Sequence, residues 1–224
     1  MWMRMIIGSM AGSCMASFVC CMAPRAVTHD RTVHSHCPHC QKRIRWYDLI
    51  PIFGYLLQKG RCRYCHHPIP PLSFSMEILF GILGGCRILA YGRRGIVDLC
   101  LLSILLYAAL YDRLTYEIPD YLHGFGVCLF MISGKTPQNG FVLALAVSLL
   151  AYLYGRCRKT IGLGGGDCKL LLWMGLFFTL SQMCVVLLIA CCMGMVYCGL
   201  QRCPKIAFAP FLLFGVSVLL FLQV

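Results

Sequence analysis

Two aspartates, Asp112 and Asp167, are the residues of this sequence best placed to do chemistry. Each lies at the edge of an apolar segment, in a chain with only 8 acidic residues. A carboxylate next to hydrocarbon is costly to keep, which favours a functional reason for it. Two carboxylates brought together can share one proton, so that one acts as a base while the other acts as an acid. Such a pair can activate a water molecule for hydrolysis of a peptide bond.

The first aspartate, Asp112, ends an apolar stretch and is followed seven residues later by Pro119. Proline is favoured at the first position of a helix, so the next helix is expected to begin there. Asp112 is therefore predicted at the end of a helix. The alternative interpretation is an interfacial acid paired with Arg113 or another loop cation. The nearby Glu117 and Asp120 are explained by the favourable position of acids at a helix start.

The second aspartate, Asp167, follows Gly164, Gly165 and Gly166 and directly precedes an apolar stretch. Glycines remove the side chains that would keep another backbone away, so these three are predicted to let an extended substrate peptide approach. One alternative is a flexible linker with Asp167 as an ordinary helix N-cap. Another is a glycine-rich nucleotide loop, which we set aside because no strand precedes it.

The composition indicates an integral membrane protein. Hydrophobic residues make up 59% of the chain and charged residues 12%, and the mean hydropathy is +0.75, far outside the range of soluble proteins. The fold class expected is an all-α polytopic membrane protein with about eight transmembrane helices. The predicted segments are 5–23, 72–91, 96–111, 118–134, 139–155, 168–181, 182–200 and 206–222. The first could be a cleaved signal peptide, but we expect a retained anchor.

The domain organisation follows from the one long polar stretch. We expect residues 1–23 to form the first transmembrane helix, 24–71 a cytoplasmic loop, and 72–224 a transmembrane helical core. The loop is too short and too rich in polar residues to bury a core of its own, so it needs another source of stability.

Four cysteines in this loop are predicted to supply that stability. Cys37 with Cys40 and Cys62 with Cys65 form two CxxC pairs separated by 21 residues, which is typical of a four-thiolate structural zinc site. The binding energy of the metal then stabilises the folded loop. The alternatives are two disulfides or a redox-active pair, which a reducing cytoplasmic compartment disfavours. We assign no function to the other 13 of the 17 cysteines.

The distribution of positive charge predicts the orientation in the membrane. Of the 20 lysines and arginines, 15 fall on loops that share one side if the first helix runs from outside to inside, and basic loops stay in the cytoplasm. Both aspartates and the cysteine-rich loop then face the cytoplasm. The net charge of +12 indicates attraction to anionic membrane lipid and does not indicate nucleic-acid binding.

Taken in order, these motifs resemble those of the type IV prepilin peptidases, aspartic proteases of the bacterial inner membrane. The stretch 35–65 resembles the tetracysteine loop of that family, and Asp112 with Pro119 resembles its first catalytic motif. Gly164 to Asp167, followed by Lys169, resembles its G-x-G-D motif. Residues 207–211 are similar to its C-terminal signature, with Ala209 where a glycine is usual. The stretch 12–24 matches the family pattern only loosely.

The resemblance implies a function, a catalytic pair and cofactors. It implies cleavage, on the cytoplasmic side and after a glycine, of the leader peptide of type IV prepilins or type II secretion pseudopilins, with Asp112 and Asp167 as catalytic residues. It also implies zinc in the loop, and N-methylation of the new N-terminus with S-adenosylmethionine, for which the sequence has no independent motif. The particular substrate and the oligomeric state stay open.

Two functions of other classes are alternatives. The chain could be a membrane thiol-redox protein that uses its CxxC pairs for exchange, although their position on the reducing side argues against this. It could also be a noncatalytic assembly or transport subunit whose aspartates contact lipid or ions. Among related proteases, the tetracysteine loop favours the prepilin branch over the preflagellin peptidases and the presenilin-like proteases.

Overall fold

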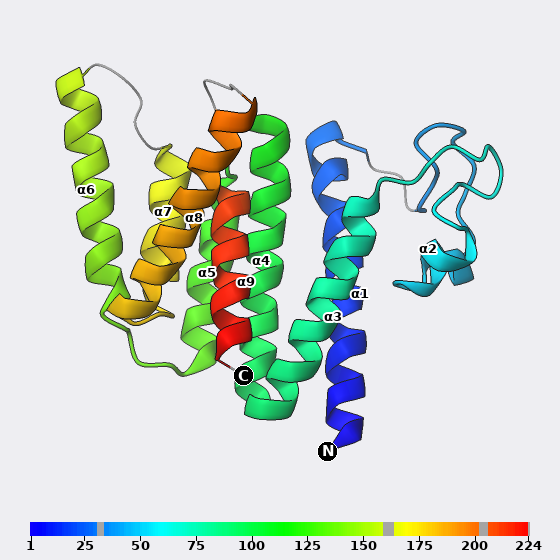
Figure 1. Cartoon of the computed structure of the whole chain (residues 1–224), viewed down its shortest axis with the longest axis horizontal. Coiled ribbons are helices and arrows are strands. Elements are labelled where there is room, and N and C mark those ends of the chain that lie inside the picture. Colours follow the sequence, from blue (N-terminus) through cyan, green and yellow to red (C-terminus); the bar gives the residue numbers. More distant parts are fainter. Residues whose placement is uncertain (31–33, 159–163, 202–205, 224) are drawn as a thin grey trace. The chain divides into compact units, whose positions relative to one another are not determined.

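The structure, a computed structural model, describes residues 1–30, 34–158, 164–201 and 206–223 and is nearly all helical, as predicted (Figure 1). The elements are α1 (Trp2–Thr28), the 3-10 helix η1 (Trp46–Leu49), α2 (Phe53–Leu57), α3 (Pro71–Tyr91), α4 (Arg93–Thr115), α5 (Asp120–Ser133), α6 (Gly140–Arg158), α7 (Gly165–Met174), α8 (Leu180–Gln201) and α9 (Ala209–Leu222). Each apolar stretch of the sequence corresponds to one long or medium helix.

Four of the described helices, α1, α3, α4 and α8, are long and apolar enough to cross a membrane. About 20 residues are needed to cross about 30 Å of hydrocarbon. By contrast, α5 and α9 have 14 residues each and α7 has 10. Within the described residues, the predicted number of eight crossings is therefore not reached on length and hydropathy.

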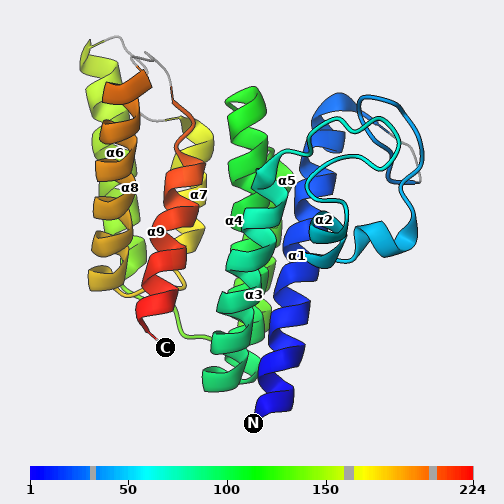
Figure 2. The same ribbon diagram turned by 45° about the vertical axis from the view of Figure 1, so that its right-hand side comes forward.

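The chain divides into two compact units, Met1–Leu99 and Cys100–Val224. In the first unit α1 and α3 lie side by side along their length (Figures 1 and 2). Small residues allow the two backbones to touch: a Cβ on Gly12 would overlap the carbonyl of Phe80. The Ser13 hydroxyl also donates a hydrogen bond to the carbonyl of Glu77 at 2.9 Å. The start of α3 is thereby fixed against the middle of α1.

A buried ion pair joins α3 to the first turns of α4 within the same unit. The Arg87 guanidinium donates to Asp98 Oδ2 from Nε at 3.0 Å and from Nη2 at 2.5 Å, and both residues are buried. The guanidinium also lies over the ring of Tyr91, 4.1 Å from its centroid. Because a buried charge is tolerated only when it is paired, each residue requires the other.

In the second unit, α5 packs against α7, while α6 contacts both α7 and α8, and α8 contacts α9. The α5–α7 contact depends on Gly126, where a Cβ would lie only 2.5 Å from the Trp173 ring. The Trp173 indole N–H donates to His123 Nδ1 at 3.3 Å. This packing places the start of α7 next to the start of α5, and both starts carry acidic side chains.

Candidate active site and candidate metal site

Asp112 lies near the end of α4, where the sequence placed it at a helix end, and only 5% of its surface is exposed. The backbone N–H of Ala209 donates to its Oδ2 at 3.1 Å. Ala209 is the first residue of α9, so the carboxylate faces the positive end of a helix dipole. Among the described residues its partner is this helix start and not the neighbouring Arg113, whose side chain is exposed.

Asp167 is the third residue of α7 and not its N-cap, which is Gly164, so the N-cap interpretation is wrong. Within the described part of the chain, the Asp167 Oδ1 atom is buried without a hydrogen-bond partner. Burial, and then the negative charge of Asp112, raise the pKa of Asp167 to about 7. A carboxyl group with this pKa can hold or release a proton at neutral pH.

The two aspartates line the same cavity, whose volume is about 270 Å³. The other lining residues are Tyr116, Glu117, Ile118, Asp120, Gly164, Gly165, Gly166 and Lys169. Lys169 Nζ lies 2.6 Å from Asp120 Oδ1 and connects the starts of α7 and α5 across this cavity. The structure thus brings both predicted aspartates and all three predicted glycines to one place, with room for water.

The three glycines differ in what surrounds them. A Cβ on Gly166 would lie 3.0 Å from Ile118 Cβ, so this glycine is needed for the packing of the protein itself. A Cβ on Gly165 would meet nothing within 4 Å, and this residue is exposed. Gly165 therefore borders open space beside the aspartates. Residues 161–163 of the same segment lie outside the described part of the chain.

Two features of the site could not be read from the sequence. The sequence predicts no role for the C-terminal signature, residues 207–211, and the structure shows that it brings the N–H of Ala209 to Asp112. The helix dipole alone accounts for Asp120 in the sequence, whereas in the structure Asp120 lines the cavity and pairs with Lys169. The sequence offers one indication of these two roles: Ala209 and Asp120 both belong to short motifs at the start of a helix.

The four predicted metal ligands form one cluster. The Sγ atoms of Cys37, Cys40, Cys62 and Cys65 all lie within 4.8 Å of one another. Two of the distances are 3.9 Å, between Cys37 and Cys65, and 4.0 Å, between Cys40 and Cys62. Tetrahedral zinc with Zn–S bonds of about 2.3 Å requires sulfur atoms about 3.8 Å apart. The cluster is therefore suited to a metal ion, and its cysteines are free thiols.

The two halves of the cluster have the same backbone conformation. The N–H of Cys37 donates to the carbonyl of Lys42 at 3.0 Å, and the N–H of Cys62 donates to that of His67 at 2.9 Å. The residue directly after each CxxC pair, Gln41 or His66, has a left-handed φ of 56°. Each turn supplies two thiols, so the two turns together supply the four that a four-thiolate site requires.

Backbone hydrogen bonds prepare one sulfur atom for metal binding. The N–H groups of Cys65 and then Tyr64 lower the pKa of Cys62 to about 6. The thiolate is the form that binds a metal. The lowered pKa of Cys62 therefore favours the thiolate at this position.

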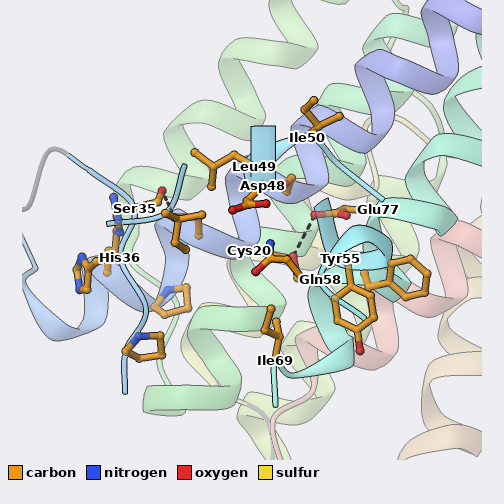
Figure 3. Close-up of a pocket in the computed structure, with 18 of the residues that line it drawn as sticks. Cys20, Ser35, His36, Asp48, Leu49, Ile50, Tyr55, Gln58, Ile69 and Glu77 are labelled. Atoms are coloured by element: carbon orange, nitrogen blue, oxygen red, sulfur yellow. Dashed lines mark hydrogen bonds between the residues drawn. The ribbon is translucent and has the colours of Figure 1, made fainter. Parts of the chain in front are cut away.

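A second cavity, of about 620 Å³, lies in the first unit between the cysteine-rich loop and the helices α1 and α3 (Figure 3). Its carboxylates are held in place: Arg63 donates to both oxygens of Asp48, at 3.1 and 2.7 Å. Glu77 Oε2 accepts the N–H of Ile52 at 2.7 Å. Ile52 has φ 66°, which is unusual for a β-branched residue and requires such support.

Two protein families match successive parts of the chain. The bacterial peptidase A24 N-terminal domain matches residues 6–91, and the type IV leader peptidase family matches residues 99–199. The two matched regions coincide closely with the two compact units.

Curated relatives match most of the chain. A prepilin leader peptidase/N-methyltransferase of Klebsiella pneumoniae is 34% identical over 168 residues, which is 70% of this chain and 73% of the relative. A protein of the same name from Neisseria gonorrhoeae is 30% identical over 190 residues, or 79% of this chain and 66% of the relative. A type 4 prepilin-like proteins leader peptide-processing enzyme of Escherichia coli is 29% identical over 203 residues, or 84% and 76%.

No solved structure matches the chain significantly. The two family matches together reach from residue 6 to residue 199 with a short gap, and they agree with the relatives and with the geometry of the site. The chain therefore belongs to the type IV leader peptidase family.

Proposed function

We propose that this protein is a membrane aspartic endopeptidase that removes the leader peptide of type IV prepilins or type II secretion pseudopilins, cutting after a glycine. The observation that carries the proposal is the cavity shared by Asp112 and Asp167. The relatives named as leader peptidases support the substrate class. The thiol-redox alternative is less favoured because four thiols gather in one metal-sized cluster and not in separate exposed pairs.

The proposed reaction uses one proton shared by the two carboxyl groups. The ionised member takes a proton from water, and the resulting hydroxide attacks the scissile carbonyl, while the protonated member donates a hydrogen bond to the carbonyl oxygen. The tetrahedral species collapses as a proton passes to the leaving amine. The two groups titrate as a pair, so the proton belongs to the pair and not to one residue.

The substrate backbone is proposed to enter beside Gly165. This glycine borders open space, and a substrate peptide can lie there without meeting a side chain. The start of α7 also presents backbone N–H groups, which can bind a carbonyl oxygen of the substrate. Lys169 and Asp120, which form an ion pair, also line this cavity.

The experiment for this proposal uses the purified protein in liposomes with a prepilin-type substrate and no other protein. We expect two products, and mass spectrometry of the mature fragment should place its N-terminus directly after the leader glycine. If the substrate stays intact although the protein has bound its metal and shows a cooperative thermal transition, the result would favour a noncatalytic assembly subunit instead.

We propose that the tetracysteine cluster holds zinc and that this ion has a structural role. Cys37, Cys40, Cys62 and Cys65 would supply four thiolates, and a closed site of this kind leaves no position for substrate. The ion stabilises a loop that has few buried apolar residues of its own. We also propose that the loop and the aspartates face the cytoplasm at the bacterial inner membrane.

A second activity, N-methylation of the new N-terminus, is proposed because relatives carry it in their names and because the larger cavity suits the methyl donor. S-adenosylmethionine carries a cationic sulfonium and an ammonium group, and it supplies the methyl group when bound. The carboxylates of Asp30 and Glu77 line this cavity, whereas that of Asp48, which also lines it, is already paired with Arg63. Arg25 lines the cavity as well and can face the carboxylate of the donor. A volume of about 620 Å³ accommodates a ligand of this size.

The methyl-donor proposal is tested by filling the cavity from α1. Cys20 lines it, whereas Cys14 is exposed on the same helix and does not. We expect Cys20→Phe to reduce binding of labelled S-adenosylmethionine at least tenfold and to leave leader cleavage and metal content unchanged, with Cys14→Phe as the matched control. Parent-like binding by Cys20→Phe would place the donor elsewhere.

A further inference from the structure

The loop between α1 and α3 carries an apolar surface that its own fold does not cover. In α2, Phe53, Leu56 and Leu57 are 65%, 56% and 67% exposed. They occupy positions i, i+3 and i+4, which lie on one face of a helix. Trp46, in the adjoining η1, is 77% exposed. We call these four residues the loop apolar face.

The opposite side of α2 is packed, which fixes the direction of the loop apolar face. Gly54 is buried, and a Cβ on it would overlap the carbonyl of Asp48. The Tyr55 ring stacks on Phe74 of α3, with 4.5 Å between centroids. The exposed face of α2 therefore points away from η1 and α3, and its direction is set by these contacts within the first unit.

The depth of α2 along the helices suits a membrane surface. With 27 residues α1 is about 40 Å long, which exceeds the hydrocarbon thickness of about 30 Å, so an upright α1 extends into the headgroup layer. Tyr55 lines the same cavity as Ser17, Cys20 and Pro24, in the C-terminal half of α1. Both ribbon views place α2 alongside α1 and α3 and not beyond their ends (Figures 1 and 2).

The charges around the loop apolar face are complementary to anionic lipid. Between residues 42 and 63 the only acid is Asp48, and it is neutralised by Arg63. Basic side chains flank the apolar segment on both sides, with Arg45 before it and Lys59 and Arg61 after it; all three are exposed. An apolar face with an aromatic residue and cationic flanks is typical of segments that lie in the membrane interface.

We propose that the loop apolar face docks into the cytoplasmic headgroup layer of the membrane, where Trp46, Phe53, Leu56 and Leu57 enter the acyl boundary and the flanking cations bind anionic lipid. The loop is then held against the bilayer at a third point, besides α1 and α3. This docking goes beyond the proposed peptidase function and does not depend on either catalytic aspartate.

The experiment measures the contact of Trp46 with lipid. The protein has 3 tryptophans, and the difference between the parent and Trp46→Phe isolates this one. In nanodiscs that contain phosphatidylglycerol, we expect Trp46 to be quenched by lipids brominated near the glycerol end of the acyl chain and protected from aqueous iodide. The control is the double variant Trp46→Phe/His39→Trp, in which the tryptophan lies between Cys37 and Cys40. We expect iodide to quench this tryptophan and brominated lipid not to quench it.

Other outcomes decide against the proposal. If iodide but not brominated lipid quenches Trp46, the face is in water, and if neither does, protein covers it; both results overturn docking. Equal lipid quenching in pure phosphatidylcholine would overturn the role of anionic lipid. Asp167→Asn, which is expected to abolish cleavage, should give the same quenching as the parent, so failure of this proposal and failure of the peptidase proposal are distinguishable.

Discussion

At the scale of single residues, the site depends on two carboxyl groups with different surroundings. Asp112 accepts a hydrogen bond from the start of α9, whereas Asp167 has a buried oxygen without a partner in the described chain. The sequence could single out both residues as candidates, because acids at the edge of apolar helices are rare and costly. It could not predict the partner of Asp112, because Ala209 lies 97 residues away along the chain.

The pKa of Asp167 predicts how cleavage depends on pH. Because this pKa is raised to about 7, the pair loses its shared proton as the pH rises through that value. We expect kcat to fall above about pH 7, approaching tenfold per pH unit, as for a single ionisation. Initial cleavage rates in liposomes between pH 5 and pH 9 measure this, and a rate that is constant up to pH 9 would contradict it.

The same shift predicts an effect on stability. A carboxyl group whose pKa is higher in the folded than in the unfolded protein binds extra protons when folded, so its ionisation lowers stability as the pH rises from about 4 to above 7. Asp167→Asn cannot ionise. We expect its melting temperature to exceed that of the parent at pH 8 and to approach it at pH 4 to 5. A lower melting temperature than the parent at pH 8 would argue against burial of this charge.

A substitution at Gly165 can distinguish a role in substrate approach from a role in folding. Because a Cβ there meets no other atom within 4 Å, we expect Gly165→Ala to keep the melting temperature and metal content of the parent but to lower kcat/KM for a prepilin at least fivefold. Gly166→Ala, which would press on Ile118, should lower both stability and activity. Parent-like cleavage by Gly165→Ala would remove this glycine from the path of the substrate.

At the scale of elements, the sequence predicted helices more reliably than it predicted membrane crossings. The apolar stretches and Pro119 gave the approximate positions of the eight longer helices, although α5 begins at Asp120, one residue after Pro119, and α7 spans Gly165–Met174 instead of 168–181. Arg87, for example, is a charged residue within an apolar stretch, and the structure buries it against Asp98. Pairings of this kind depend on how α3 meets α4, and local sequence carries no information about that.

The contact between α5 and α7 sets the position of Asp167 and can be tested with two glycines of one helix. A Cβ on Gly126 would enter the Trp173 ring, whereas a Cβ on Gly124 meets nothing within 4 Å. We expect Gly126→Ala to destabilise the protein by about 1–3 kcal/mol through overpacking and to slow cleavage. Gly124→Ala should be neutral or slightly stabilising, because alanine favours helix over glycine. Thermal melts and cleavage rates of the two variants compare them directly.

The cysteine cluster is tested by removing one ligand. We expect Cys37→Ser to lose most bound zinc, measured by elemental analysis of reduced purified protein, and to lower protein abundance more than the turnover of the remaining folded enzyme. Cys14→Ser is the control, since Cys14 is exposed on α1 and outside the cluster. Zinc content equal to that of the parent in Cys37→Ser would exclude this residue as a ligand.

At the scale of the whole molecule, two units carry two kinds of site. The first unit holds the cysteine cluster and the larger cavity, and the second holds both aspartates. Composition and charge alone predicted a polytopic membrane protein with its basic loops on one side.

The proposed orientation places the loop at Lys59 inside and the loop at Lys135 outside. An epitope inserted after Lys135 should be accessible in intact spheroplasts, and one inserted after Lys59 only after permeabilisation; the reverse pattern would invert the proposed topology.

The central claim is that Asp112 and Asp167 act as one catalytic unit, and the most direct measurement is the cleavage rate of a prepilin in liposomes by Asp112→Asn, Asp167→Asn and the double variant. Each single change keeps the side-chain volume and removes one carboxyl group. We expect each single variant to lose at least a thousandfold in kcat/KM, and the double variant to be no slower than the slower single variant, because a pair that shares one proton is disabled by either loss. Cleavage within about twofold of the parent by either single variant, with its metal retained, would contradict the account.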